Sequence, residues 1–102
     1  MKHTLTDEQY GILSELVIRP LQAAGAEVYL FGSRATGHHH PFSDVDLVFV
    51  LPPKKWIQSG DLREIKQRIE ESHFPFAVDL VDWNELVDSY RPSVLEQRIH
   101  LD

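Results

Sequence analysis

Three short apolar runs constrain the fold of this 102-residue chain more than any other feature. They are rich in β-branched and aromatic residues and span residues 27–31, 45–51 and 76–82. Gly32 follows the first run, Pro52 follows the second and Pro75 precedes the third, so turn-forming residues bound all three. This pattern predicts three buried β-strands, and the chain is expected to fold around a small sheet.

A helical pattern precedes the first of these strands. From Thr6 to Ala24 the apolar residues recur at spacings of three and four, which indicates an amphipathic helix. Thr6 and Gln9 resemble a capping box at its start, and Gly25 is a plausible stop. Pro20 lacks a backbone N–H and clashes with the preceding turn, so it predicts either a kink or two helical pieces.

Two further helices complete the predicted arrangement. An amphipathic helix is expected over residues 61–72 and a short helix over 94–101. The resulting order is typical of an α/β or α+β sandwich in which helices cover a small mixed sheet. At this length we expect a single domain, residues 1–102, and a bulky acceptor substrate would have to come from another molecule.

Composition narrows the classes of function. Ten Lys and Arg against sixteen Asp and Glu give a net charge of −6, which disfavours tight binding to nucleic acid. The absence of cysteine excludes disulfides, thiolate zinc sites and thiol catalysis. Acidic residues precede any apolar run at the N-terminus, and no stretch approaches membrane-spanning length. We therefore expect no signal peptide, no membrane association and a cytoplasmic location.

Aspartates interrupt the second and third apolar runs. Asp44 and Asp46 are two residues apart, so on an extended strand they point to the same face, about 6.5 Å apart. Asp79 likewise lies between apolar neighbours. An unpaired buried carboxylate costs several kcal/mol, and carboxylate oxygens suit Mg²⁺. If the third strand lies beside the second, the three carboxylates are expected to gather a divalent cation.

The third position of this site has a competitor. Asp82 lies three residues after Asp79, and two such positions on a strand face opposite sides, so only one can join the pair. Asp79 is favoured because both of its neighbours are apolar, whereas Asp82 is typical of a strand end or a helix cap. Asp44 taken alone could also be an ordinary loop end.

A glycine–serine pair directly follows the first predicted strand. Gly32 lets the backbone approach a phosphate, and a helical turn after Ser33 would aim free N–H groups at it. Ten residues then separate Ser33 from Asp44-Val45-Asp46. Gly-Ser, ten residues, Asp-x-Asp and a later lone Asp resemble the nucleotidyltransferase superfamily that includes DNA polymerase β and kanamycin nucleotidyltransferase.

A closer resemblance is to the minimal nucleotidyltransferase (MNT) group, commonly encoded beside a helical HEPN partner. It rests on the runs Phe31–Gly37 and Ser43–Leu47. It implies the polymerase β-like fold and a Mg²⁺-dependent enzyme that transfers AMP from ATP to a tyrosine of a HEPN-type RNA-cleaving toxin. The chain would then be the antitoxin of a toxin–antitoxin pair.

The resemblance also implies a role for individual residues. The catalytic ligands of two Mg²⁺ ions would be Asp44, Asp46 and Asp79. Gly32 and Ser33 would hold the nucleotide phosphates. Arg34 could steady the departing pyrophosphate through charge-assisted hydrogen bonds, and a surface ion pair is the alternative.

Two other functions remain open at this stage. The acceptor could be a small molecule such as an aminoglycoside, bound across a homodimer. Alternatively, the chain could be a non-catalytic module that neutralises its partner by contact alone, although docking alone does not need clustered carboxylates.

Several side chains lie outside the motif. Three consecutive histidines at 38–40 are expected in a solvated loop. Three aromatic side chains could stack on an adenine but are more typical of a core: Trp56, Trp83 and Phe74. Tyr29 and Tyr90 could accept a nucleotide in self-modification.

Overall fold

The computed structural model describes residues 4–102, in which four strands form one mixed sheet. The strands are β1 (Glu27–Phe31), β2 (Val45–Val50), β3 (Val78–Asp82) and β4 (Ile99–Leu101). Their order across the sheet is β3-β2-β1-β4. Strand β1 is antiparallel to β2 and β4, whereas β2 and β3 are parallel. The predicted small mixed sheet is confirmed.

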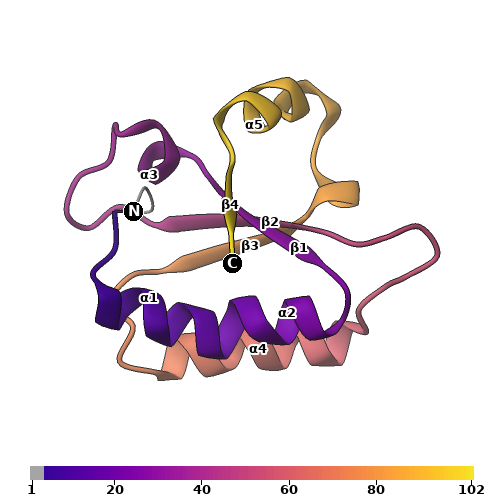
Figure 1. The fold of residues 1–102 in the computed structure, drawn as a ribbon, viewed down its shortest axis with the longest axis horizontal. Helices are drawn as coiled ribbons and strands as arrows, with labels where there is room; N and C mark the ends of the chain where they lie inside the picture. The colour runs from indigo at the N-terminus through magenta and orange to yellow at the C-terminus, as the bar shows by residue number, and fades with distance from the viewer. Residues whose placement is uncertain (1–3) are drawn as a thin grey trace.

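Helices lie on both sides of this sheet (Figure 1). The N-terminal helical segment consists of α1 (Asp7–Leu13), a wider turn η1 (Ser14–Ile18) and α2 (Arg19–Ala23). The other helices are α3 (Ser33–Thr36), α4 (Ser59–Glu71) and α5 (Arg91–Gln97), with short turns η2 (Trp83–Glu85) and η3 (Asp88–Tyr90). Helix α4 is the crossover that the parallel pair β2–β3 requires.

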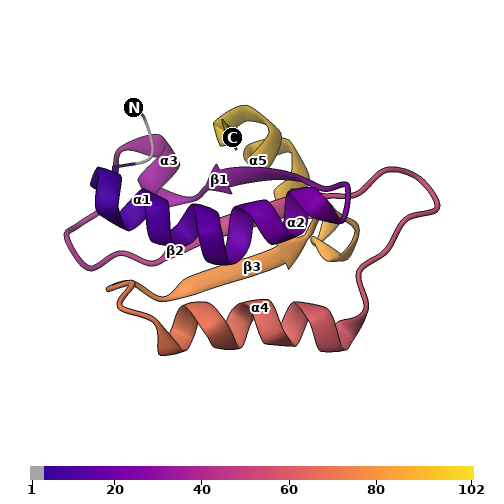
Figure 2. The same ribbon diagram turned by 60° about the horizontal axis from the view of Figure 1, so that its bottom comes forward.

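The core lies between one face of the sheet and two long helical segments, α1–α2 and α4 (Figures 1 and 2). Alternate strand residues point into it, including Leu30, Leu47 and Leu80, and each is at most 5% exposed. They pack in one cluster with side chains such as Leu13 from the N-terminal helix and Ile69 from α4. Burial of each such side chain contributes about 1.5–3 kcal/mol. The strand residues between these core residues point to the opposite face of the sheet.

The start and end of the N-terminal helix follow the sequence signals. The Thr6 hydroxyl accepts a hydrogen bond from the Gln9 amide at 3.1 Å, and Gln9 Oε1 accepts one from the Thr6 amide at 3.0 Å. This reciprocal pair confirms the predicted capping box. Gly25 follows the helix with a φ of +94°, a conformation that suits the glycine stop.

Near Pro20, where either a kink or two helical pieces was predicted, the structure has two α-helical pieces, α1 and α2, joined by the wider turn η1. The N–H of Arg19 bonds to the carbonyl of Ser14, one residue farther back than in an α-helix. This wider, π-type turn lies directly before the position where Pro20 cannot donate, and the flanking residues Ile18 and Arg19 keep helical dihedral angles. The widened turn therefore accommodates the proline while the helical path continues.

The short helix predicted over residues 94–101 is present only in part, as α5 (Arg91–Gln97), so its predicted end is wrong. Helix α5 ends at Gln97, and Arg98 is extended. The last three residues before Asp102 instead form β4, in which Leu101 pairs with Val28 of β1. The reason is tertiary: an apolar–polar–apolar triplet completes the edge of the sheet by pairing with a strand about 70 residues earlier in the chain.

The described part of the chain has no helix that is long and apolar enough to cross a membrane. Residues 1–3 belong to the N-terminal segment for which no signal peptide was expected, and they lie outside the described residues.

Candidate active site

The face of the sheet opposite the core carries the predicted aspartates. Asp46 of β2 pairs in register with Asp79 of β3. Such partners in a parallel pair lie about 4.8 Å apart and project from the same face. Asp44 lies just ahead of β2, two residues before Asp46. Asp44 and Asp79 are exposed, whereas Asp46 is half-buried. The structure thus brings Asp46 and Asp79 together, which meets the condition on which a shared cation site was expected.

Asp82 does not join this group. It pairs in register with Phe49, whose side chain lies on the core face. Its Oδ1 accepts a hydrogen bond of 2.9 Å from the Asn84 amide and so caps the start of η2. The helix-cap alternative considered for Asp82 is therefore what the structure shows.

The charge on Asp46 is unfavourable without a ligand. Burial, followed by the charges of Asp79 and Asp44, raises the pKa of the Asp46 carboxyl to about 6. The ion pairs found in the described residues involve other acids, and they are Glu64–Arg68, Asp88–Arg91 and His100–Asp102. Negative charge at the site is therefore not balanced by a cationic side chain.

A complete metal cage is not already formed. Among residues 4–102, no three side chains of His, Asp or Glu are clustered closely enough to hold a metal ion by themselves. Mg²⁺ sites in proteins, however, commonly use one or two carboxylates and complete the coordination shell with water and substrate phosphates. Asp44, Asp46 and Asp79 would therefore need the phosphates of a bound nucleotide to complete a Mg²⁺ site.

The stability of the metal-free protein should depend on pH through Asp46. Its pKa of about 6 in the folded state exceeds its ordinary value of 3.8, so folding favours the protonated form. The stabilisation is fully present below about pH 4 and is lost as the pH rises through 6. Because Asp46 is only half-buried and solvent screens its charge, we expect this loss to lower the free energy of unfolding by about 1 kcal/mol between about pH 4 and pH 7.

Urea unfolding at a series of pH values, in the presence of a chelator, measures this effect. The Asp46→Asn variant should show a correspondingly shallower loss of stability over the same interval. Parallel pH curves for the two proteins would contradict the assignment.

Gly32 lies against the Asp46 carboxylate. Phe31, the last residue of β1, pairs with Asp46, and Gly32 follows with φ +77° and ψ −158°. That conformation is essentially confined to glycine. A Cβ built at Gly32 would overlap Asp46 Oδ2 and lie 3.2 Å from Cγ of the same side chain. The glycine therefore brings the chain close to Asp46, at the point where Ser33 begins α3.

Arg34 has a different environment from the one predicted. Its side chain is only 3% exposed. Its Nε donates to the Ser43 carbonyl at 3.0 Å, its Nη1 to the Thr4 hydroxyl at 2.9 Å, and its Nη2 to the Pro41 carbonyl at 3.5 Å. The guanidinium also lies 4.1 Å from the centre of the Phe76 ring. Every guanidinium nitrogen has an acceptor, so neither a pyrophosphate contact nor the alternative surface ion pair matches this geometry.

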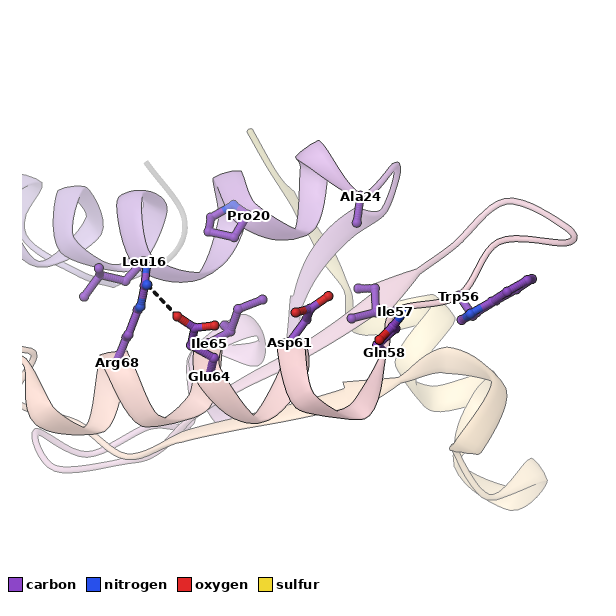
Figure 3. A pocket seen from close by; sticks show the side chains of 10 residues that line it. All are labelled: Leu16, Pro20, Ala24, Trp56, Ile57, Gln58, Asp61, Glu64, Ile65 and Arg68. Carbon is purple, nitrogen blue, oxygen red and sulfur yellow. Dashed lines mark hydrogen bonds and ion pairs between the residues drawn. The ribbon is translucent and has the colours of Figure 1, made fainter.

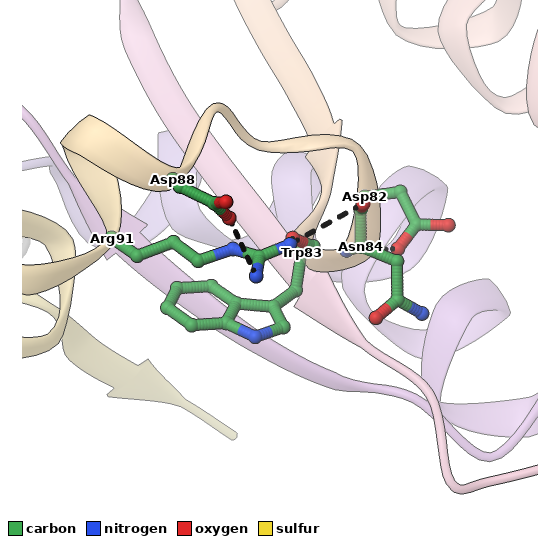
Figure 4. A network of polar contacts seen from close by, with 5 residues as sticks. All are labelled: Asp82, Trp83, Asn84, Asp88 and Arg91. Carbon is green, nitrogen blue, oxygen red and sulfur yellow. Dashed lines mark hydrogen bonds and ion pairs between the residues drawn. The ribbon is translucent and has the colours of Figure 1, made fainter.

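The aromatic side chains expected in the core are found in three different settings. Phe74 is buried, as expected. Trp83 is half-buried, with the Arg91 guanidinium 5.4 Å from its ring centre (Figure 4). Trp56 is 76% exposed, so the core prediction is wrong for it. Trp56 belongs to the loop between β2 and α4, and its apolar neighbour Ile57 is the one that packs against the core.

The histidine segment and the two tyrosines remain outside the aspartate group. His38 and His40 are exposed in the loop, and His39 is half-buried. The Tyr29 hydroxyl donates to Glu27 at 2.8 Å, and Tyr90 is exposed. Self-modification of either tyrosine stays a prediction.

A cavity of about 490 Å³ lies elsewhere, between the N-terminal helix and α4 (Figure 3). Its lining comes from these helices and from the loop before α4, and consists of Leu16, Pro20, Ala24, Trp56, Ile57, Gln58, Asp61, Glu64, Ile65 and Arg68. These helices cover the core face of the sheet, whereas Asp46 and Asp79 project from the other face. The cavity is therefore separate from the candidate active site.

Comparison with known proteins gives three kinds of match. Residues 11–101 match the family described as "Nucleotidyltransferase domain". A Haemophilus influenzae protein named "Probable protein adenylyltransferase MntA" is 33% identical over 64 residues, which are 63% of this chain and 54% of that protein. The chain thus spans about half the length of this curated relative.

Solved structures show the same fold. A protein assigned as a minimal nucleotidyltransferase is 27% identical, with a TM-score of 0.69 over 96% of this chain and 98% of that one. A toxin–antitoxin complex with AMP-PNP gives 24% identity and a TM-score of 0.65, covering 85% of this chain and 70% of that one. A Shewanella oneidensis complex of tri-AMPylated HEPN toxin with MNT antitoxin gives 21% identity and a TM-score of 0.60, covering 90% and 70%.

Proposed function

Since the chain belongs to the nucleotidyltransferase domain family, we propose that it transfers AMP from ATP to a hydroxyl group of a protein. One observation carries this proposal. Asp46 and Asp79 pair in register on the face of the sheet opposite the core, beside a glycine whose backbone approaches Asp46. This arrangement supports a phosphate-and-metal site at the same end of β2 as the Gly-Ser turn.

The aspartates fit a divalent cation in chemistry and in charge. Their carboxylate oxygens are the ligands that Mg²⁺ prefers, and no ion pair within the described residues neutralises them. We assign two Mg²⁺ ions to Asp44, Asp46 and Asp79. When bound, these ions would lower the pKa of the incoming hydroxyl and neutralise the triphosphate.

Gly32 and Ser33 are assigned to the phosphates of ATP. The bare Cα of Gly32 leaves the space beside Asp46 open, so a phosphate group could approach the backbone at the start of α3. The acceptor oxygen would bond to the α-phosphorus as the bond to pyrophosphate breaks. Arg34 is not assigned to this step, because its guanidinium is occupied by the loop before β2.

The acceptor is proposed to be a tyrosine of a HEPN-type toxin, which makes the chain an antitoxin. Two relatives support this choice: the Haemophilus influenzae protein bears the name of a protein adenylyltransferase, and the Shewanella oneidensis complex holds an AMPylated HEPN toxin.

The test mixes the protein, a HEPN-domain protein as the proposed partner, and ATP labelled at the α-phosphate. We expect label on the partner, a mass gain equal to whole AMP units and loss of both with Asp44→Asn. Label on an aminoglycoside in the absence of a partner would indicate the small-molecule function instead. Full inhibition of the toxin by Asp44→Asn, without label, would indicate neutralisation by contact alone.

A further inference from the structure

Arg34 is a buried cation whose partners are all uncharged. Its acceptors are two backbone carbonyls and the Thr4 hydroxyl, with the Phe76 ring against its guanidinium. No acidic side chain of the described residues forms an ion pair with it. Burying a charge among neutral groups is costly, so these contacts are an unusual use of an arginine in a small domain.

The contacts of Arg34 hold the backbone that leads into Asp44. The Ser43 carbonyl, which accepts from Nε at 3.0 Å, belongs to the peptide unit that joins Ser43 to Asp44. The peptide unit on the other side of Asp44 is also held, because the Val45 amide donates to the Ala77 carbonyl at 2.9 Å. Arg34 therefore fixes one of the two peptide planes that set the direction of the Asp44 side chain.

The same guanidinium also reaches the lead-in to β3. Phe76, which it stacks on, directly precedes Ala77 and lies three residues before Asp79. Arg34 itself lies one residue after Ser33, in α3. One side chain thus links the Gly-Ser turn, the segment before Asp44 and the segment before Asp79.

We propose that Arg34 is a positioning residue: it orients Asp44 for divalent-metal binding by holding the peptide between Ser43 and Asp44. The inference rests on the proposed function, since it takes Asp44 to be a metal ligand. Asp44 is exposed and lies outside β2, so the strand ladder alone does not fix it. Loss of a group that orients a metal ligand typically weakens metal binding by about 10-fold to 100-fold.

The test measures Mn²⁺ binding by electron paramagnetic resonance in the presence of AMP-PNP. Arg34→Gln removes the charge and the pair of hydrogen bonds to the Ser43 and Pro41 carbonyls. Arg34→Lys keeps the charge, but its single ammonium group cannot reproduce the separate Nε and Nη2 contacts to Ser43 and Pro41. We expect about 10-fold or greater weakening of Mn²⁺ binding in both variants. Restoration of wild-type affinity by lysine would show that charge alone matters and would overturn the proposal.

Arg91 provides a matched control at the other end of β3 (Figure 4). Its guanidinium also donates to two backbone carbonyls, of Trp83 at 3.2 Å and Asn84 at 3.4 Å, and also faces an aromatic ring. Arg91→Gln should therefore lose similar hydrogen bonds, together with an ion pair to Asp88 that has no counterpart at Arg34 among the described residues, and keep wild-type Mn²⁺ affinity. Equal Mn²⁺ affinities for Arg34→Gln and Arg91→Gln would overturn the proposal.

Hydrogen exchange of the metal-free protein separates the inference from the proposed function. The Ser43 amide bonds to the His40 carbonyl at 3.0 Å within the loop that Arg34 holds. Its exchange should accelerate in Arg34→Gln but not in Arg91→Gln, and unchanged exchange would overturn the proposal. If wild-type protein bound no Mn²⁺ with AMP-PNP while the exchange result held, the metal site itself would be wrong. Arg34 would then organise the loop only, and its positioning role toward a metal ligand would fall as well.

Discussion

The Asp46→Asn variant is expected to lose AMP transfer by about 10³-fold while its metal-free form becomes more stable than the wild type. Asparagine keeps the size of the side chain but lacks the anionic oxygens that a Mg²⁺ ion requires. It also removes a carboxylate that burial and the charges of Asp79 and Asp44 oppose. Opposite effects on activity and stability are the mark of a residue retained for function.

Single-turnover transfer of AMP from ATP labelled at the α-phosphate measures the loss of activity. Urea unfolding near pH 7 with a chelator measures the gain in stability. Asp82→Asn is the matched control, because Asp82 lies nearby in sequence but caps η2 from the other face of the sheet. It should keep AMP transfer and alter stability by about 1 kcal/mol or less. An Asp46→Asn protein that transfers AMP at the wild-type rate would remove Asp46 from the site.

The Gly32→Ala variant is expected to lose AMP transfer by about 10²-fold or more and stability by about 1–3 kcal/mol. The new methyl group would overlap Asp46 Oδ2, in a backbone conformation with φ +77°. Either the Asp46 carboxylate or the turn before α3 must then move. Both are assigned to the same nucleotide–metal site.

Gly37→Ala separates steric overlap from backbone strain. Gly37 also has a positive φ, of +81°, but no atom lies within 4 Å of a Cβ built there. This variant should lose about 1–2 kcal/mol of stability and change transfer by only a few fold. Thermal unfolding measures the stability of the Gly32→Ala and Gly37→Ala variants, and single-turnover AMP transfer measures their activity. Similar transfer rates for the two would show that the closeness of Gly32 to Asp46 has no catalytic meaning.

The sequence predicted most of the local elements, and which face of each strand a side chain lies on, because both depend on short-range periodicity. Alternation along a strand is enough to separate Asp79 from Asp82. It does not fix Asp44, which lies just before β2. The parallel pairing that brings Asp46 beside Asp79 follows once a helix connects the two strands. The capping box of the first helix depends on residues only three apart.

Features that depend on distant contacts could not be predicted in this way. Strand β4 forms by pairing with β1, and its three residues carry too little pattern to be distinguished from the end of α5. The environment of Arg34 depends on Thr4, thirty residues away, and on the ring of Phe76. From the sequence alone, an arginine beside a glycine–serine turn is as consistent with a phosphate contact as with the buried position that Arg34 has in the structure.

Calorimetric titration with AMP-PNP, with and without Mg²⁺, tests most directly whether the three aspartates bind metal beside the nucleotide. In wild-type protein we expect binding that requires Mg²⁺, and at least about 10-fold weaker binding in Asp79→Asn, whose side chain lies in register with Asp46. Equal binding in the presence of a chelator, or an unchanged affinity in Asp79→Asn, would contradict this account.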